Sequence, residues 1–111
     1  MDQIALTSKE LTLLKEILSK SGASKAFLFG SVVNGKFHTT KSDLDILVQL
    51  EETDPLKKGE TLLRLWDDLE SSLNRKIDLL TPESIKNPIF KYEVNRTKVL
   101  CYDRKGEKMD A

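Results

Sequence analysis

The sequence predicts an α/β (α+β) fold, in which helices pack on one small mixed β-sheet. Along its 111 residues, apolar side chains recur at helical spacing and then at strand spacing, in the order helix, strand, loop, strand, helix, strand, helix, strand. This order is typical of one layered domain, and the length suits a single domain. We therefore expect one domain over residues 1–111, with its core at about residues 8–103 and a flexible tail at 104–111.

The first helix is expected over residues 8–21. Thr7 and Glu10 have the spacing of a capping box, in which each side chain accepts a hydrogen bond from the other residue's backbone amide. Apolar residues then recur at helical spacing, namely Leu11, Leu14, Ile17 and Leu18. Gly22 suits the left-handed position that follows a helix.

Two strands are expected on either side of a polar loop. Residues 26–29 form a short apolar run, and residues 43–50 are rich in β-branched and aliphatic side chains. The intervening residues 30–42 are rich in Gly, Ser, Thr, Asn and Lys, with room for a short helical turn but not for a full crossover helix.

The C-terminal half is expected to hold two further helices and two short strands. Asp54 and Pro55 have the residue types of a helix cap and first helical position, and Asn87 with Pro88 repeats that pattern. The buried stripe of the helix after Pro55 comprises Leu62, Trp66, Leu69 and Leu73. The short apolar runs at 76–80 and 99–102 predict the two strands.

Composition excludes several classes of protein. Eighteen Lys and Arg balance eighteen Asp and Glu, so no net charge draws the chain onto polyanions, and we expect no general nucleic-acid binding. One cysteine and one histidine exclude a disulfide framework and a metal site built from several such residues.

No apolar run has the ~20 residues of a membrane-spanning helix, and the first residues lack the features of a signal peptide. The expected location is the cytoplasm, without a membrane partner.

Asp43 and Asp45 are the first candidate site residues. Two residues apart in a strand, they are expected to point to the same face, opposite the apolar face of Leu44, Ile46 and Val48. Aspartate is rare in strands and like charges repel, so a bound cation would explain the pair, and Mg²⁺ prefers such oxygen ligands. The alternative is that Asp43 caps a turn and Asp45 lies at a solvated edge; the pair alone does not decide.

Asp78 adds a third carboxylate. It lies between Ile77 and Leu79, so it is expected on the opposite face of its strand from these apolar neighbours. If this strand pairs beside the one carrying Asp45, three carboxylates converge, as in a two-metal site for displacement at phosphorus. A lone strand aspartate is more often a surface residue, so Asp78 is informative only together with the pair.

Gly30 and Ser31 follow the first buried strand and offer a close backbone approach, a hydroxyl and an amide to phosphate oxygens. A P-loop is excluded, although Gly30, Gly35 and Lys36 have its spacing. Phe37 stands where the P-loop needs Ser or Thr for Mg²⁺.

Taken together, the segments Phe29-Gly30-Ser31, Gly35 and Ser42-Asp43-Leu44-Asp45 resemble the signature of the DNA polymerase beta-like nucleotidyltransferase superfamily. The short chain is similar to its minimal nucleotidyltransferases (MNT), which are often encoded beside HEPN-domain proteins as toxin–antitoxin pairs. This resemblance covers about residues 8–102 and implies the nucleotidyltransferase fold, which is like the polymerase beta palm.

The resemblance also implies roles for individual residues. Metal binding and catalysis would fall to Asp43, Asp45 and Asp78, and nucleotide binding to Gly30, Ser31, Lys36, Lys41 and Ser42. Many members carry an arginine where this chain has Asn34, and Lys36 or Lys41 would supply that cation. The implied cofactor is Mg²⁺, with Mn²⁺ as the alternative, and ATP is the implied substrate.

The function expected from this resemblance is Mg²⁺-dependent transfer of AMP from ATP to a hydroxyl group. The 111 residues leave no room for an acceptor domain, so a partner protein would present the acceptor. The expected partner is the HEPN toxin, with a tyrosine hydroxyl as the target. The chain would then be the antitoxin of that pair. The alternative is a non-catalytic antitoxin that neutralises its partner by contact; Asn34 and the eleven residues between Ser31 and Asp43 favour this alternative. A homo-oligomer stays open.

Overall fold

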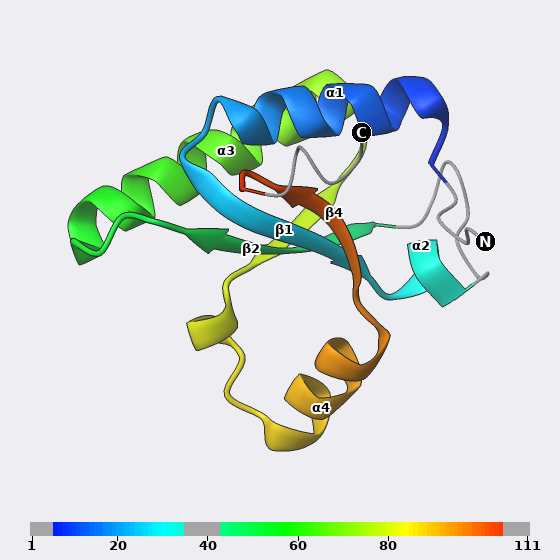
Figure 1. Cartoon of the computed structure of the whole chain (residues 1–111), viewed down its shortest axis with the longest axis vertical. Coiled ribbons are helices and arrows are strands. Elements are labelled where there is room, and N and C mark those ends of the chain that lie inside the picture. Colours follow the sequence, from blue (N-terminus) through cyan, green and yellow to red (C-terminus); the bar gives the residue numbers. More distant parts are fainter. Residues whose placement is uncertain (1–5, 35–42, 106–111) are drawn as a thin grey trace.

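The computed structural model describes residues 6–34 and 43–105, and it confirms the predicted layered α/β arrangement (Figure 1). The elements in chain order are α1 (Ser8–Ser19), β1 (Ala23–Phe29), α2 (Ser31–Asn34), β2 (Leu44–Leu50), α3 (Pro55–Leu73), β3 (Ile77–Leu80), the 3₁₀ turn η1 (Pro82–Ser84), α4 (Pro88–Thr97) and β4 (Val99–Asp103). The four strands form one mixed sheet in the order β3-β2-β1-β4. In Figure 1, α1 and α3 lie on one side of this sheet and α4 on the other.

The predicted helix starts are confirmed by their caps. Thr7 and Glu10 form the capping box at the start of α1. The Asp54 side chain accepts a hydrogen bond from the Lys57 amide at 3.1 Å at the start of α3. Asn87 Oδ1 accepts from two amides of α4 at 2.9 and 3.1 Å. The three polar residues that the sequence predicts as caps therefore accept hydrogen bonds from backbone amides at the starts of the three longer helices. These amides have no partner within the helix itself.

The end of α1 and the beginning of β1 differ from the prediction. α1 ends at Ser19 rather than at residue 21, because the Lys20 and Ser21 amides donate to carbonyls three residues back and close the last turn tightly. β1 begins at Ala23 rather than at residue 26. Its first residues include polar side chains and join the sheet through backbone pairing with β2, which the side-chain pattern does not reveal.

The prediction that the flexible tail begins at residue 104 was wrong for Arg104. The Arg104 amide donates to the Ser24 carbonyl at 2.9 Å, and its guanidinium pairs with Glu51. These contacts hold the chain against the beginning of β1 just after β4 ends. Residues 106–111 lie outside the described part of the chain.

The sheet has a core on both faces. Alternate residues of a strand point to opposite sides, so Leu44, Ile46 and Val48 of β2 join the larger core under α1 and α3. Leu47 points the other way and joins a smaller cluster on the side of α4 with Phe29, Ile85 and Val94. Asp45, which has the same parity as Leu47, therefore belongs to the α4 face of the sheet.

Helix α3 packs on the larger core much as predicted, with two differences. Leu65, Leu69 and Leu73 are its buried residues, and Leu65 was not expected. Leu62 and Trp66 are only half-buried at the edge of the core. No helix in the described part of the chain is long and apolar enough to span a membrane.

Strand β3 forms one edge of the sheet and is held on its outer side by α3. Trp66 Nε1 donates to the Ile77 carbonyl at 2.8 Å, and the Ile77 amide donates to Glu70 Oε2 at 3.0 Å. Both backbone polar groups of this strand residue are therefore satisfied by side chains of α3. The helix thereby fixes the position of the residue that follows, Asp78.

Replacing Trp66 with Phe tests this attachment. The ring remains apolar and aromatic, but the carbonyl of the buried Ile77 loses its donor, so the free energy of unfolding should fall by about 1–3 kcal/mol in urea titrations. Leu63→Ala on the same helix is the control, because Leu63 is 69% exposed and its loss should change stability by less than about 0.5 kcal/mol. Equal stability of Trp66→Phe and the wild type would contradict the proposed attachment.

Candidate active site

Asp45 and Asp78 occupy matching positions on neighbouring strands. β2 and β3 run parallel, and the register pairs Asp45 directly with Asp78. Paired residues on neighbouring strands point to the same face, and such strands lie about 4.8 Å apart. The prediction that the strand carrying Asp78 pairs beside the strand carrying Asp45 is therefore confirmed.

Asp43 lies just outside the sheet. The predicted strand over 43–50 begins instead at Leu44, whose amide donates to the Lys76 carbonyl at 3.0 Å. Asp43 lies before this first backbone hydrogen bond of the strand, and its side chain is exposed. The predicted start of the strand was therefore wrong by one residue, because pairing with β3 starts one residue later than the pattern of side chains suggested.

Asp43 and Asp78 nevertheless act electrostatically on Asp45. The pKa of Asp45 is raised to about 6, first by burial and then by the negative charges of Asp78 and Asp43. Within residues 6–34 and 43–105, no three side chains of His, Cys, Asp or Glu form a group that could hold a metal ion. Joint metal binding by all three acids therefore stays a prediction.

The donor set fits a hard divalent cation. Asp43, Asp45 and Asp78 offer carboxylate oxygens, which Mg²⁺ and Mn²⁺ prefer, whereas zinc sites in proteins usually contain nitrogen or sulfur ligands. The raised pKa of Asp45 shows that its ionised form lacks compensating positive charge in the folded chain. A bound cation would supply that charge, so the chemistry of the in-register pair Asp45 and Asp78 suits Mg²⁺.

Gly30 lies against the carboxylate of Asp45. It follows the last residue of β1 with a φ of +76°, a left-handed backbone conformation, and Phe29 before it pairs with Asp45. A Cβ atom at Gly30 would lie 2.3 Å from Asp45 Oδ2 and 3.2 Å from its Cγ. Glycine is therefore required at this position for the Asp45 carboxylate to lie so close. The predicted close approach of the Gly30 backbone to a phosphate stays a prediction.

Ser31 is the other predicted phosphate-binding residue that the structure describes. It is half-buried and begins the short helix α2, which is closed by a 3.1 Å hydrogen bond from the Val33 amide to the Gly30 carbonyl. The short helical turn expected after Gly30 is therefore confirmed. Lys36, Lys41 and Ser42 lie outside the described residues, so their roles in nucleotide binding stay predictions.

A cavity that the sequence did not reveal adjoins Gly30. Its volume is about 280 Å³, and it lies between the end of β1, α2 and α4. Its lining residues are Phe29, Gly30, Val33, Phe90, Glu93, Val94, Arg96 and Thr97. The signal available in the sequence was the helical spacing of positions 90, 93, 94 and 97, which share one face of α4.

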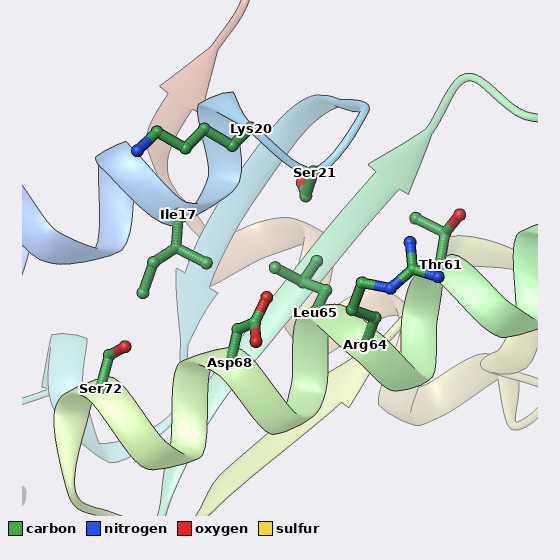
Figure 2. Close-up of a pocket in the computed structure, with 8 residues that line it drawn as sticks. All are labelled: Ile17, Lys20, Ser21, Thr61, Arg64, Leu65, Asp68 and Ser72. Carbon is green, nitrogen blue, oxygen red and sulfur yellow. The ribbon is translucent and has the colours of Figure 1, made fainter.

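Figure 2 shows another pocket, between α1 and α3. In this view Asp68 projects from α3 toward α1, and the Arg64 guanidinium lies near Thr61. The pocket lies on the side of the larger core, away from the α4 face that carries Asp45, and contains none of the predicted site residues. It is therefore not the candidate active site.

Comparison with known proteins shows which family and which relatives the chain resembles. A family model described as polymerase beta, nucleotidyltransferase matches residues 12–107. A candidate protein adenylyltransferase of Methanocaldococcus jannaschii, MJ1379, is 36% identical over 94 residues, which cover 78% of this chain and 92% of that protein. A second from the same organism, MJ0435, is 40% identical over 75 residues, covering 68% of this chain and 75% of that protein.

Solved structures share the fold. A chain from a toxin–antitoxin crystal structure with AMP-PNP superposes with a TM-score of 0.65 at 20% identity, covering 94% of this chain and 80% of that one. A chain from the complex of tri-AMPylated Shewanella oneidensis HEPN toxin with MNT antitoxin gives 0.62 at 18% identity, covering 94% and 78%. A candidate minimal nucleotidyltransferase gives 0.60 at 25% identity, covering 82% and 88%.

The contact between Gly30 and Asp45 can be tested with a second glycine as reference. Gly22 also has a left-handed φ, of +87°, but nothing lies within 4 Å of its hypothetical Cβ. Gly22→Ala should therefore cost only the backbone strain, about 1–2 kcal/mol, while Gly30→Ala should cost about 1–3 kcal/mol more because of the overlap with Asp45.

A double-mutant cycle, read from urea unfolding, isolates this overlap. In an Asp45→Ala background the Cβ at position 30 meets no carboxylate, so Gly30→Ala should cost about as much as Gly22→Ala. An undiminished cost of Gly30→Ala in that background would show that backbone strain, not the carboxylate, requires glycine.

The raised pKa of Asp45 predicts a pH-dependent stability difference. Because its folded-state pKa, about 6, lies above the ordinary value of 3.8, the ionised group destabilises the fold. This penalty is absent below about pH 3.8, grows between the two pKa values and is complete above about pH 6.

Asp45→Asn removes the ionisable group while keeping its shape. The variant should therefore exceed the wild type in free energy of unfolding by about 1 kcal/mol near neutral pH in EDTA, a value reduced for the solvent that still reaches this half-buried group. The difference should vanish near about pH 3.5, and a variant less stable than the wild type at both pH values would make Asp45 a structural residue.

Proposed function

Because the chain belongs to the polymerase beta nucleotidyltransferase family, we propose that it transfers AMP from ATP to a hydroxyl group of a partner protein. The observation that carries this proposal is the in-register pair of Asp45 and Asp78 beside Gly30 and Ser31. This arrangement combines a cation-attracting carboxylate pair with a turn suited to phosphate oxygens. The sequence relatives named as candidate protein adenylyltransferases support AMP transfer to a protein.

Each predicted residue has a distinct part in this proposal. Asp43, Asp45 and Asp78 hold Mg²⁺, for which Mn²⁺ is the alternative. A metal held there would supply positive charge next to the phosphates during transfer. The Gly30 backbone and the Ser31 hydroxyl and amide bind phosphate oxygens, and we assign Lys36, Lys41 and Ser42 to the same triphosphate.

The chemical step balances as a displacement at phosphorus. The acceptor oxygen forms a bond to the α-phosphorus, the bond from that phosphorus to the bridging oxygen breaks, and pyrophosphate leaves. The hydroxyl proton passes to a carboxylate of the cluster. Asp78 suits this role because its side chain is exposed and can return the proton to water.

A partner has to deliver the acceptor. The described residues form one sheet with its helices, and none of them builds a second unit around the carboxylates. The structural neighbours support the identity of the partner, because they come from toxin–antitoxin complexes, one of which contains an AMPylated HEPN toxin. We therefore assign the chain as the antitoxin of a HEPN toxin, with a tyrosine hydroxyl of the toxin as acceptor.

Intact-mass spectrometry of the co-expressed pair tests this function. The HEPN protein encoded beside this chain should gain the mass of one or more AMP groups, and Asp45→Asn should abolish the gain, because the carboxylate pair is needed for charge neutralisation. Asp67→Asn is the matched control, since this exposed aspartate of α3 lies outside the site and its loss should leave the modification intact.

The contact antitoxin is the competing outcome. Two features of the sequence favour it: Asn34 stands where many family members carry an arginine, and eleven residues separate Ser31 from Asp43. In that case the toxin would remain unmodified, and the wild type and Asp45→Asn would inhibit it equally well.

A further inference from the structure

Tyr92 of α4 presents a tyrosine hydroxyl to solvent. The sequence contains two tyrosines, and both lie in the part of the chain that the structure describes. The Tyr92 side chain is 64% exposed, whereas Tyr102 is half-buried and packs against the larger core. In our proposed function the acceptor on the toxin is a tyrosine hydroxyl. Tyr92 therefore carries the same reactive group on the surface of this chain itself.

The direction of Tyr92 keeps it away from the carboxylates of its own chain. Val94 is buried in the smaller core on the α4 face of the sheet. Side chains two residues apart in a helix point about 200° away from each other, so Tyr92 lies on the outer side of α4. It is also not among the residues that line the cavity beside Gly30. A nucleotide that the Tyr92 hydroxyl reaches is therefore one held by a second copy of the chain.

The surface around α4 is basic, although the chain as a whole has no net charge. Residues 86–98 contain four basic side chains and a single acid. Lys86 and Lys91 are exposed, and within the described part of the chain neither of them forms an ion pair. Arg96 Nη2 donates to Glu93 Oε1 at 2.7 Å, which leaves further guanidinium donors for another acceptor. This surface therefore attracts anionic groups.

The candidate active site has the opposite charge. Asp43 and Asp78 act on Asp45 with their negative charges, and no cation among the described residues offsets these charges at Asp45. ATP brings further negative charge to the site. Because opposite charges attract two protein surfaces and orient them, the basic side of α4 suits the carboxylate site of a second copy. Arg96 lies one helical turn after Tyr92, so both side chains approach the phosphates together.

We propose that the chain is also its own substrate: the candidate active site of one copy transfers AMP from ATP to the Tyr92 hydroxyl of another copy. This inference rests on the proposed function, because it uses the same transfer. Tyr92 Oη forms a bond to the α-phosphorus, the bond from that phosphorus to the bridging oxygen breaks, and pyrophosphate leaves with its electron pair. The hydroxyl proton passes to the Asp78 carboxylate of the copy that holds the nucleotide. The new phosphodiester lies beside Arg96 of the modified copy, where a charge-assisted hydrogen bond stabilises it.

Intact-mass spectrometry of the purified chain, incubated alone with ATP and Mg²⁺, tests the proposal. The wild type should gain the mass of a single AMP group, and peptide mapping should place this group on Tyr92. Tyr92→Phe keeps the exposed ring but has no hydroxyl, so it should lose the gain. Tyr102→Phe is the matched control and should keep it, because Tyr102 is half-buried on β4. A gain that persists in Tyr92→Phe would overturn the inference.

Mixing two variants tests whether the transfer runs between copies. Tyr92→Phe retains the carboxylates but lacks the acceptor, and Asp45→Asn retains the acceptor but lacks an intact site. Neither variant should gain mass alone, while in the mixture the Asp45→Asn chain should gain AMP. The two chains differ in mass, so the spectrum identifies the modified one. An unmodified mixture, under conditions in which the wild type is modified, would overturn transfer between copies.

Charge reversal tests the attraction between α4 and the carboxylate site. Lys86→Glu/Lys91→Glu should slow self-modification at least about tenfold at low salt, and added salt should shrink this difference. Lys20→Glu/Lys57→Glu is the matched control: it changes the net charge equally, but at two exposed residues beside α1 and α3, on the other side of the sheet (Figure 1). Equal rates for the two double variants would overturn the assigned docking surface.

The co-expressed toxin separates this inference from the proposed function. A toxin that gains AMP while the chain itself stays unmodified would overturn self-transfer and leave the proposed function standing. Absence of AMP from both proteins would overturn the proposed function itself.

Discussion

The parallel pairing of β2 with β3 is the contact on which the rest of the structure depends. It places Asp45 beside Asp78, and it requires a crossover between the two strands, which α3 provides. That helix covers the larger core and holds the outer edge of β3 through Trp66 and Glu70. The loop after α3 also contributes, since Arg75 pairs with Glu10 at 2.8 Å and so connects the start of β3 to the cap of α1.

The site concentrates negative charge that the fold itself does not neutralise. Asp45 is half-buried beside two other acids, and its pKa is raised as a result. Such an arrangement lowers the stability of the folded chain and is retained where a ligand brings the opposite charge. The surrounding apolar packing on both faces of the sheet offsets this cost, which is why the acids can be close together in a small domain.

The sequence determines the elements more clearly than their pairing. Caps at Thr7, Asp54 and Asn87 are local, because each side chain bonds amides within its own turn, and all three were predicted. The alternation around Asp45 likewise placed it opposite the apolar face of β2.

Features that depend on tertiary contacts escaped prediction. The early start of β1 follows from its backbone pairing with β2, and the exclusion of Asp43 from β2 follows from where the ladder with β3 begins. The role of Gly30 could not be read either, because it depends on the register that sets Phe29 opposite Asp45. The cavity at α4 combines residues from distant segments for the same reason.

The central position of β1 has a consequence for the order of folding. β1 pairs with β2, which follows it closely in the chain, but also with β4, where Phe27 meets Leu100. Contacts between residues so far apart in sequence form slowly, because a long loop must close first. Since α4 leads directly into β4, we expect α4 to assemble last, so that the chain gains its larger core before the smaller core on the α4 face.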